Sequence, residues 1–217
     1  MSVNRTDAYV PENDEFTIDA RPNQSTSSAI ASGWSAAEIV PATYAEEFKF
    51  SEGVYQVVKF LDEDGPFAVY RQHFLSQKQE GKKSYISLGH NDPLCTKLGS
   101  KPEEKRAFSI LNLSATGGPT RQMLIASPRL FKSLHAAHFS PQGPLTKNYW
   151  ALSRSGKMQT TTYHINPVKP RDLMEDWNID EATADAASAA AMPFTRADLK
   201  EPTWEELEAI ANSLMGL

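Results

Sequence analysis

Residues 105–125 read KRAFSILNLSATGGPTRQMLI and contain two apolar runs separated by a stretch of small residues. The runs, at 107–113 and 122–125, are rich in the aliphatic and aromatic residues that strands favour. The ATGGP between them holds the glycine and proline typical of a turn. This stretch therefore predicts two strands joined by a turn.

The same pattern continues over the middle of the chain, with turn residues between several of the runs. Further short apolar runs lie at 54–60, 67–74, 84–88, 149–152 and 160–165. A helix interrupts the series over 129–139. Ser127 and Pro128 suit its start, and apolar residues recur after them at helical spacing.

About seven short strands and one helix within roughly 120 residues favour a small antiparallel barrel over alternating strands and helices. We expect a mainly β fold. It consists of an OB-like antiparallel barrel with a short helix, additional strands, and acidic N- and C-terminal tails that are irregular or helical. An SH3-like barrel or a β-sandwich fits the pattern almost as well, because the pattern does not contain the strand order.

The charge of the 217-residue chain, −5 in total, is unevenly distributed. Residues 1–48 carry 2 basic and 8 acidic side chains, and residues 172–217 carry 2 and 11. Residues 49–171 between them carry 18 basic and 8 acidic side chains. A basic middle with acidic ends indicates contact with nucleic acid or a membrane surface. Incidental clustering of charge on a solvated surface is the alternative.

These shifts divide the chain into three expected parts. An acidic N-terminal arm covers 1–48, and its Ser-, Ala- and Thr-rich stretch at 20–43 favours flexibility. A basic OB-like core covers 49–171. An acidic C-terminal tail with a terminal amphipathic helix covers 172–217.

The terminal helix begins at a capping box formed by Thr203 and Glu206. One of its faces is apolar and consists of Trp204, Leu207, Ile210 and Leu214. An apolar helical stripe of this kind suits the groove of a partner protein. The same stripe would equally suit packing onto the chain's own core.

No motif of a common catalytic site is present. The chain lacks a phosphate-binding loop, a nucleophile elbow and an H-E-x-x-H zinc motif, and its core lacks paired carboxylates for two metal ions. It also lacks the ~20 apolar residues of a membrane span and an apolar N-terminal signal. We therefore expect a non-enzymatic, cytoplasmic protein that does not contact membranes.

Basic and aromatic residues are interleaved along the predicted strands. Single-stranded DNA binding needs both, since cations follow the phosphates and exposed rings stack on unpaired bases. The predicted DNA-binding residues are Tyr70, Arg71, His73, Phe74, Lys82, Lys83, Tyr85, Lys101, Lys105, Arg106, Tyr149, Trp150, Arg154, Lys157 and Tyr163. A small barrel also needs large rings inside, and Phe60, Phe67, Phe108 and Trp150 favour that role.

The chain has a single cysteine, which excludes an internal disulfide and a four-thiolate metal site. The candidate metal ligands are His73, His90 and Cys95, with Asp92 beside them. Structural zinc usually takes four Cys or His ligands, and this spacing does not supply them. We therefore predict no metal, with Cys95 a small buried apolar residue.

Four segments together resemble a known family. They are YRQHF at 70–74, KKSYISLGHNDPLCTKLGSKPEEKRAFSILNL at 82–113, SPRLFKSLHAA at 127–137 and GPLTKNYWALSRSGKMQTTTYHINPV at 143–168. They are similar to the helix-destabilising, single-stranded DNA-binding proteins of tailed phages. The resemblance covers about residues 50–172.

The resemblance implies an OB-fold that binds single-stranded DNA cooperatively and without sequence preference in replication, recombination or repair. It also implies an acidic C-terminal tail that contacts replication or recombination proteins, and a host-cell cytoplasmic location during infection. The family carries a zinc loop with a C-P-x-C motif, whereas DPLC at 92–95 has Asp92 at the first cysteine. The zinc site is therefore expected to be degenerate or absent.

Two other functions fit the same features. The basic barrel would serve a phage structural or interaction protein that docks an acidic partner. It would also serve an RNA-binding module.

Overall fold

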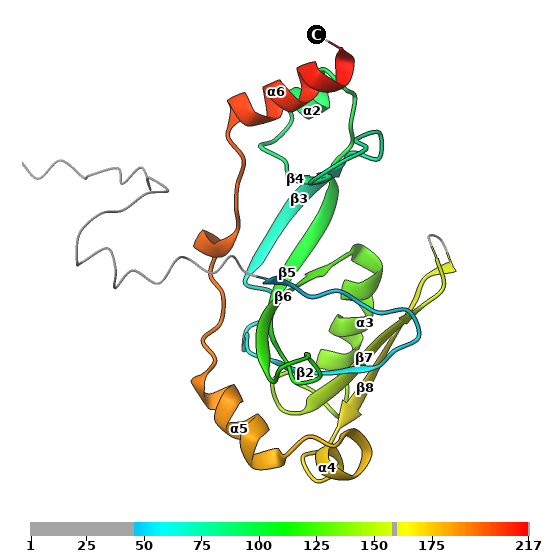
Figure 1. The fold of residues 1–217 in the computed structure, drawn as a ribbon, viewed down its shortest axis with the longest axis vertical. Coiled ribbons are helices and arrows are strands. Elements are labelled where there is room, and N and C mark those ends of the chain that lie inside the picture. Colours follow the sequence, from blue (N-terminus) through cyan, green and yellow to red (C-terminus); the bar gives the residue numbers. More distant parts are fainter. Residues whose placement is uncertain (1–45, 158–159, 217) are drawn as a thin grey trace, which may run out of the picture. The chain divides into compact units, whose positions relative to one another are not determined.

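An eight-stranded sheet dominates the computed structural model, which describes residues 46–157 and 160–216 (Figure 1). Its central hairpin is β5 (Glu103–Asn112) and β6 (Thr120–Ala126), antiparallel and joined by the predicted turn. Gly117 and Gly118 in this turn have φ angles of 98° and 111°, a backbone region that favours glycine. The strand pair expected from residues 105–125 is therefore confirmed.

The sheet has the strand order β1-β6-β5-β2-β7-β8, and β3 joins it by pairing with β5 and β4. The remaining strands are β1 (Glu46–Glu47), β2 (Gln56–Phe60), β3 (Ala68–Phe74), β4 (Ser84–Ile86), β7 (Tyr149–Ser155) and β8 (Thr162–Val168). All strand pairs are antiparallel except β1 with β6. In the described part of the chain the sheet does not close, so the fold is mixed α and β with a mostly antiparallel open sheet.

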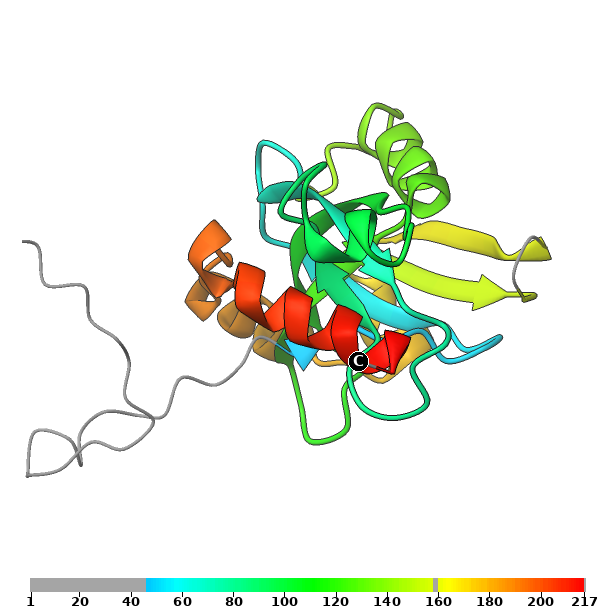
Figure 2. The same cartoon turned by 90° about the horizontal axis from the view of Figure 1, so that it is seen from above.

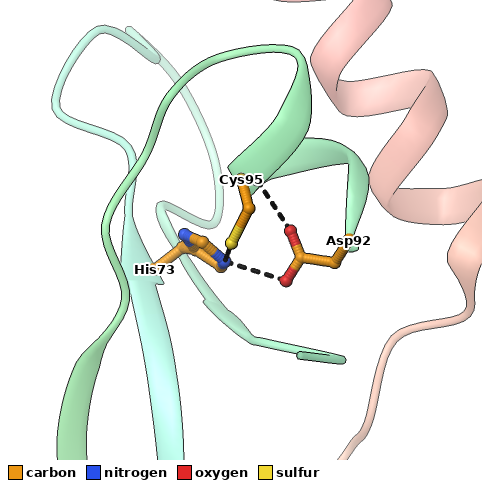
Figure 3. A group of neighbouring side chains, drawn as sticks. All are labelled: His73, Asp92 and Cys95. Carbon is orange, nitrogen blue, oxygen red and sulfur yellow. Dashed lines mark hydrogen bonds and ion pairs between the residues drawn. The ribbon is translucent and has the colours of Figure 1, made fainter. Parts of the chain in front are cut away.

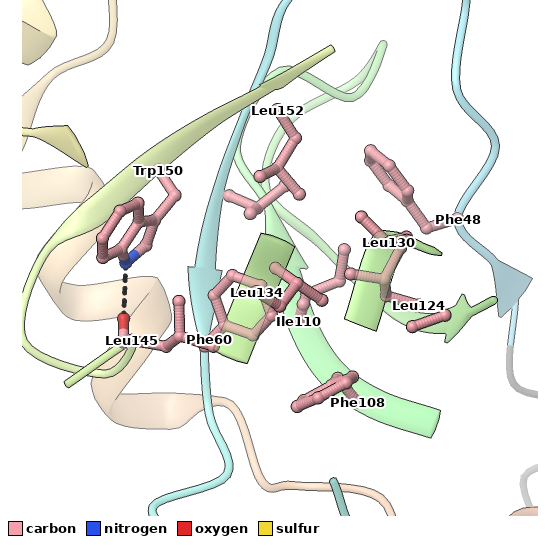
Figure 4. Close-up of a cluster of buried hydrophobic side chains, with 12 residues drawn as sticks. Phe48, Phe60, Phe108, Ile110, Leu124, Leu130, Leu134, Leu145, Trp150 and Leu152 are labelled. Atoms are coloured by element: carbon pink, nitrogen blue, oxygen red, sulfur yellow. Dashed lines mark hydrogen bonds between the residues drawn. The ribbon is translucent and has the colours of Figure 1, made fainter. Parts of the chain in front are cut away.

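Helix α3 (Pro128–His138) packs against the sheet. It begins as predicted, because the Ser127 side chain accepts a hydrogen bond from the Leu130 N–H and Pro128 is its first residue. The helix contacts β5, β6 and β8. It adds Leu130 and Leu134 to a core cluster that includes Phe60, Phe108, Ile110, Trp150 and Leu152 (Figure 4).

The acidic C-terminal residues pack onto the sheet. Helices α4 (Asp172–Trp177) and α5 (Glu181–Ala190) bury Leu173 and Ala184 in a second cluster with residues of β2, β5 and β7. Figures 1 and 2 show the β7–β8 hairpin extending away from α5. Residues 172–216 therefore share a core with the described part of the basic middle.

A connecting segment then crosses β5 and β6. The Phe194 ring is buried with Ala107 and Met123, and the Phe194 N–H donates to Ser109 Oγ at 2.8 Å. A 3₁₀ turn, η2 (Arg196–Asp198), follows. The N-terminal arm predicted for 1–48 lies almost wholly outside the described residues.

The terminal helix α6 (Trp204–Met215) has the predicted capping box. Leu207 and Ala211 are fully buried against Leu75, Tyr85 and Leu94. Ile210 and Leu214 are half-buried in the same cluster, whereas Trp204 is 45% exposed. Most of the apolar face proposed for a partner protein is therefore used inside the fold.

The loop beneath α6 contains the short helix α2 (Pro93–Thr96). The Lys97 Nζ donates to Glu208 Oε1 at 2.6 Å and to Asn212 Oδ1 at 2.9 Å, which adds polar contacts to the apolar ones. Among the helices described, none is long and apolar enough to cross a bilayer.

Substituting Leu207 by alanine tests the packing of α6. We expect Leu207→Ala to lower the free energy of unfolding by about 2–5 kcal/mol, the usual cost of truncating a buried leucine. Urea denaturation measures this change. Ser213→Ala, on the exposed side of the same helix, should change it by less than about 0.5 kcal/mol. Equally small effects of both substitutions would contradict the packing.

Candidate nucleic-acid interface

A groove of about 660 Å³ brings together residues from parts of the chain that are far apart in sequence. We call it the Arg154 groove. Strands β3, β4 and β5 contribute Gln72, Phe74, Ser84, Glu103 and Lys105. The other lining residues are Glu47, Phe48, Lys49, Phe50, Ile125, Ser127, Leu130, Arg154 and Tyr163.

Three partly exposed rings line the Arg154 groove. Tyr163 and Phe50 lie with their ring centroids 5.4 Å apart, and Phe74, from β3, is 64% exposed. Tyr163 is directly opposite Arg154 in the β7–β8 ladder, so both side chains lie on one face of the hairpin. The groove therefore combines accessible aromatic surface with a cation.

Cations outnumber carboxylates in the Arg154 groove. Lys49, Lys105 and Arg154 line it together with Glu47 and Glu103, and Lys105 is paired with Glu103 at 3.0 Å. Arg154 Nε is buried and has no hydrogen-bond partner among the described residues. The other such atom is Gln56 Oε1, on the strand that pairs with β7. Buried polar atoms are nearly always paired, so these two atoms are exceptions within the part of the chain that the structure describes.

Four predicted DNA-binding residues meet in this groove: Phe74, Lys105, Arg154 and Tyr163. Sequence reasoning missed Lys49 and Phe50. The close spacing of aromatic and basic residues at Phe48, Lys49 and Phe50 is a signal that could have identified them.

Four predicted residues are instead buried. His73, Tyr85, Tyr149 and Trp150 are each less than a tenth exposed and offer no face for a base to stack on. They therefore do not belong to the candidate interface. For Trp150 the structure confirms the expected core role.

Tyr149 is buried because β7 lies between β2 and β8 and is covered on both faces. Its hydroxyl donates to Asp185 Oδ1 at 2.5 Å, and Lys59 Nζ lies 4.8 Å from its ring centre. Burial first, and then the hydrogen bond with Asp185, raises the pKa of Tyr149. The ring thus fastens α5 to the sheet.

The remaining predicted residues lie outside the groove. Arg71, Lys82, Lys83, Lys101 and Lys157 are exposed or half-buried elsewhere on the surface. Tyr70 packs in the cluster around Phe194, and burial, with a smaller effect of Glu47, raises its pKa to about 12. Arg106 forms an ion pair with Glu104, and its guanidinium lies 3.9 Å from the centre of the Phe131 ring.

A polar cluster of His73 and Asp92, both buried, and the half-buried Cys95 lies beneath α6 (Figure 3), so the prediction of Cys95 as a buried apolar residue is wrong. We call it the His73 cluster. The His73 Nε2 atom is 2.9 Å from Asp92 Oδ2 and 3.7 Å from Cys95 Sγ, and His73 Nδ1 is 2.9 Å from Ser100 Oγ. Both ring nitrogens are therefore engaged. The imidazole ties β3 to the loop that carries α2.

Asp92 is the centre of this cluster. Its carboxylate accepts hydrogen bonds from Ser87 Oγ at 2.6 Å, from the Cys95 N–H at 2.8 Å and from the Leu88 N–H at 3.2 Å. Burial alone would raise the pKa of Asp92, but these bonds and His73 together hold the pKa below its usual value. The same carboxylate caps the N-terminus of α2.

The His73 cluster does not supply the four Cys or His ligands usual for structural zinc, because its ligand atoms, which lie within 4.8 Å of one another, come from three residues and one is a carboxylate. Burial first, and then the nearby charge of Asp92, raises the pKa of Cys95. The Asp92 carboxylate is already fully hydrogen-bonded, and His90 is exposed and not part of the cluster. In this chain hydrogen bonds hold the loop that the resemblance assigns to zinc.

The chain matches no protein-family model, no curated protein and no solved structure. Its similarity to the phage DNA-binding family therefore stays a prediction that rests on the four segments quoted above.

The composition of the His73 cluster leads us to expect a protein that folds without stoichiometric zinc. Dialysis against a chelator should change the free energy of unfolding by less than about 0.5 kcal/mol, because no metal bond is lost. Cys95→Ser should fold normally, since a hydroxyl can replace the thiol in its contacts with Gly89 O at 3.6 Å and with His73 Nε2 at 3.7 Å. Elemental analysis that finds one zinc ion per chain, lost together with stability in Cys95→Ser, would contradict this expectation.

The lowered pKa of Asp92 makes stability depend on pH. A carboxyl group with a depressed pKa stabilises the fold above its unfolded pKa of ~3.9 and loses this effect as the pH falls through the folded pKa. The free energy of unfolding should therefore fall with acidification more steeply in the wild type than in Asp92→Asn. Urea denaturation at several pH values measures this. Glu63→Gln, an exposed carboxylate, should keep the wild-type slope, and parallel curves for the wild type and Asp92→Asn would refute the assignment.

Proposed function

We propose that the Arg154 groove binds single-stranded DNA without sequence preference. The observation that carries the proposal is a groove in which Arg154 lies beside three partly exposed rings. A guanidinium binds phosphate oxygens through paired N–H donors. The rings would stack on successive bases.

The arrangement favours single strands over duplex. Stacking on Phe50, Phe74 and Tyr163 requires bases that are not paired, because a duplex hides their faces. Every base has such a face, so this contact does not select a sequence. Lys49 and Lys105 would attract the backbone from either end of the groove.

We also propose the wider role that the quoted segments suggest. In this proposal the protein is not an enzyme and acts in phage replication, recombination or repair in the host cytoplasm. Its open sheet, with α3 packed against it, is compatible with the partly open barrel of OB-folds. Contacts with replication or recombination proteins would use the exposed Trp204 and the acidic surface of α6.

Substitutions of Arg154 and Tyr163 in the groove, with an arginine outside it as the control, test the proposal. Arg154→Ala should weaken oligo(dT) binding and reduce the slope of log K against log salt by about 0.7, the value for one phosphate contact on a single strand. Fluorescence anisotropy of labelled oligonucleotide at several salt concentrations measures both. Tyr163→Ala should weaken binding by about 1–3 kcal/mol and leave the slope unchanged.

Arg171→Ala is the control, because this arginine is 76% exposed and paired with Asp172 outside the groove. It should leave both affinity and slope unchanged. Equal effects of Arg154→Ala and Arg171→Ala would exclude the groove as the binding site. Tighter binding of duplex DNA or of RNA than of oligo(dT) would overturn the proposed ligand.

A further inference from the structure

A second, smaller pocket lies at the C-terminal end of α3. It has a volume of about 180 Å³ and is lined mainly by apolar and aromatic side chains. Phe131, His135, His138 and Phe139 come from α3 and its C-cap, and Asp64 comes from the turn between β2 and β3. We call it the Phe139 pocket.

The rings at this pocket are arranged around an exposed phenylalanine. Phe139 is 72% exposed, and its ring centre lies 4.6 Å from that of His135 and 4.7 Å from that of His138. Phe131 follows at 5.7 Å from His135. This row of rings leaves a planar apolar surface exposed to solvent. Such exposure is thermodynamically unfavourable, and a planar ligand that stacks on the rings would remove it.

The size of the pocket limits the ligand. Sites for drug-sized molecules span about 300–1,000 Å³, so 180 Å³ suits a single ring system. The apolar lining suits the faces of such a ring, and the Asp64 carboxylate and the backbone of Gly65 offer acceptors and a donor for its edge. A nucleobase has both features, a π-face and hydrogen-bonding edges.

Helix α3 leads from the Arg154 groove to the Phe139 pocket. Leu130 lines the groove, and the next residue, Phe131, lines the pocket. The guanidinium of Arg106, from β5, lies 3.9 Å from the centre of the Phe131 ring and adds a cation there. Helix α3 contains no carboxylate and carries the exposed Lys132, so a phosphate backbone can follow it.

We propose that the Phe139 pocket takes an unpaired base of the same strand that occupies the Arg154 groove. This inference rests on the proposed function. It adds one contact to those of the groove: a base stacked on the exposed Phe139 ring, beyond the bases stacked on Phe50, Phe74 and Tyr163.

Phe139→Ala tests the pocket, because removal of an exposed side chain leaves the core intact. The affinity for oligo(dT) should fall by about 5- to 150-fold, the range for loss of one base–aromatic stack. The salt slope should not change, since no phosphate contact is lost. Affinity for an abasic strand of the same length, which keeps the phosphates, should stay as in the wild type. Val69→Ala, exposed on β3 and outside both sites, should bind both strands normally.

Wild-type affinity of Phe139→Ala for oligo(dT) would overturn the pocket and leave the groove standing, provided that Arg154→Ala still lowers the slope. Equal losses on oligo(dT) and on the abasic strand would also overturn it, because the effect would not involve a base. A change in self-association alone, measured by sedimentation, would identify a protein contact and overturn it too. If the wild type binds no oligonucleotide, the proposed function itself fails.

Discussion

The central strands are buried on both faces, and the rest of the structure depends on this. Val58 and Trp150 pack against α3, while their neighbours Val57 and Tyr149 pack under α4 and α5. A sheet with only one covered face would expose Val57 and Tyr149 to water. Burying an aliphatic or aromatic side chain of this size stabilises by about 1.5–3 kcal/mol. The acidic C-terminal residues are therefore part of the fold, although their charge resembles that of a solvated tail.

The elements with local signals were predictable from sequence. Three such elements form as predicted, because residues within each one determine its conformation. They are the turn at 115–119, the Ser127 cap of α3 and the capping box at Thr203. Burial on both faces was less apparent, yet it had a sequence signal. A strand covered on both sides reads as a continuous apolar run, as in YWAL at 149–152. If this run is interpreted as a strand with one buried and one exposed face, one of its two rings is placed in solvent, whereas both are buried.

The candidate site was predictable only in part, because a groove depends on which distant segments meet. Phe74 and Arg154 were identified from their residue types alone, but nothing local shows that β3 and β7 border one hollow. Lys49 and Phe50 join them through the parallel pairing of β1 with β6, which residues 46–50 continue. His73 shows the opposite case. Its residue type suits DNA or metal, whereas its environment is a hydrogen-bonded core.

The His73 cluster also links the fold to the groove. His73 and Phe74 are consecutive on β3, so their side chains point to opposite faces: the imidazole to Asp92 and the ring to the Arg154 groove. Asp92 in turn caps α2, and Leu94 in α2 packs against Leu207 of α6. The terminal helix, the buried hydrogen bond between His73 and Asp92 and the groove ring therefore form one connected series of contacts. A zinc ion would hold such a loop through metal bonds, whereas here one carboxylate with four hydrogen-bonding neighbours does so, and the position of Phe74 depends on it.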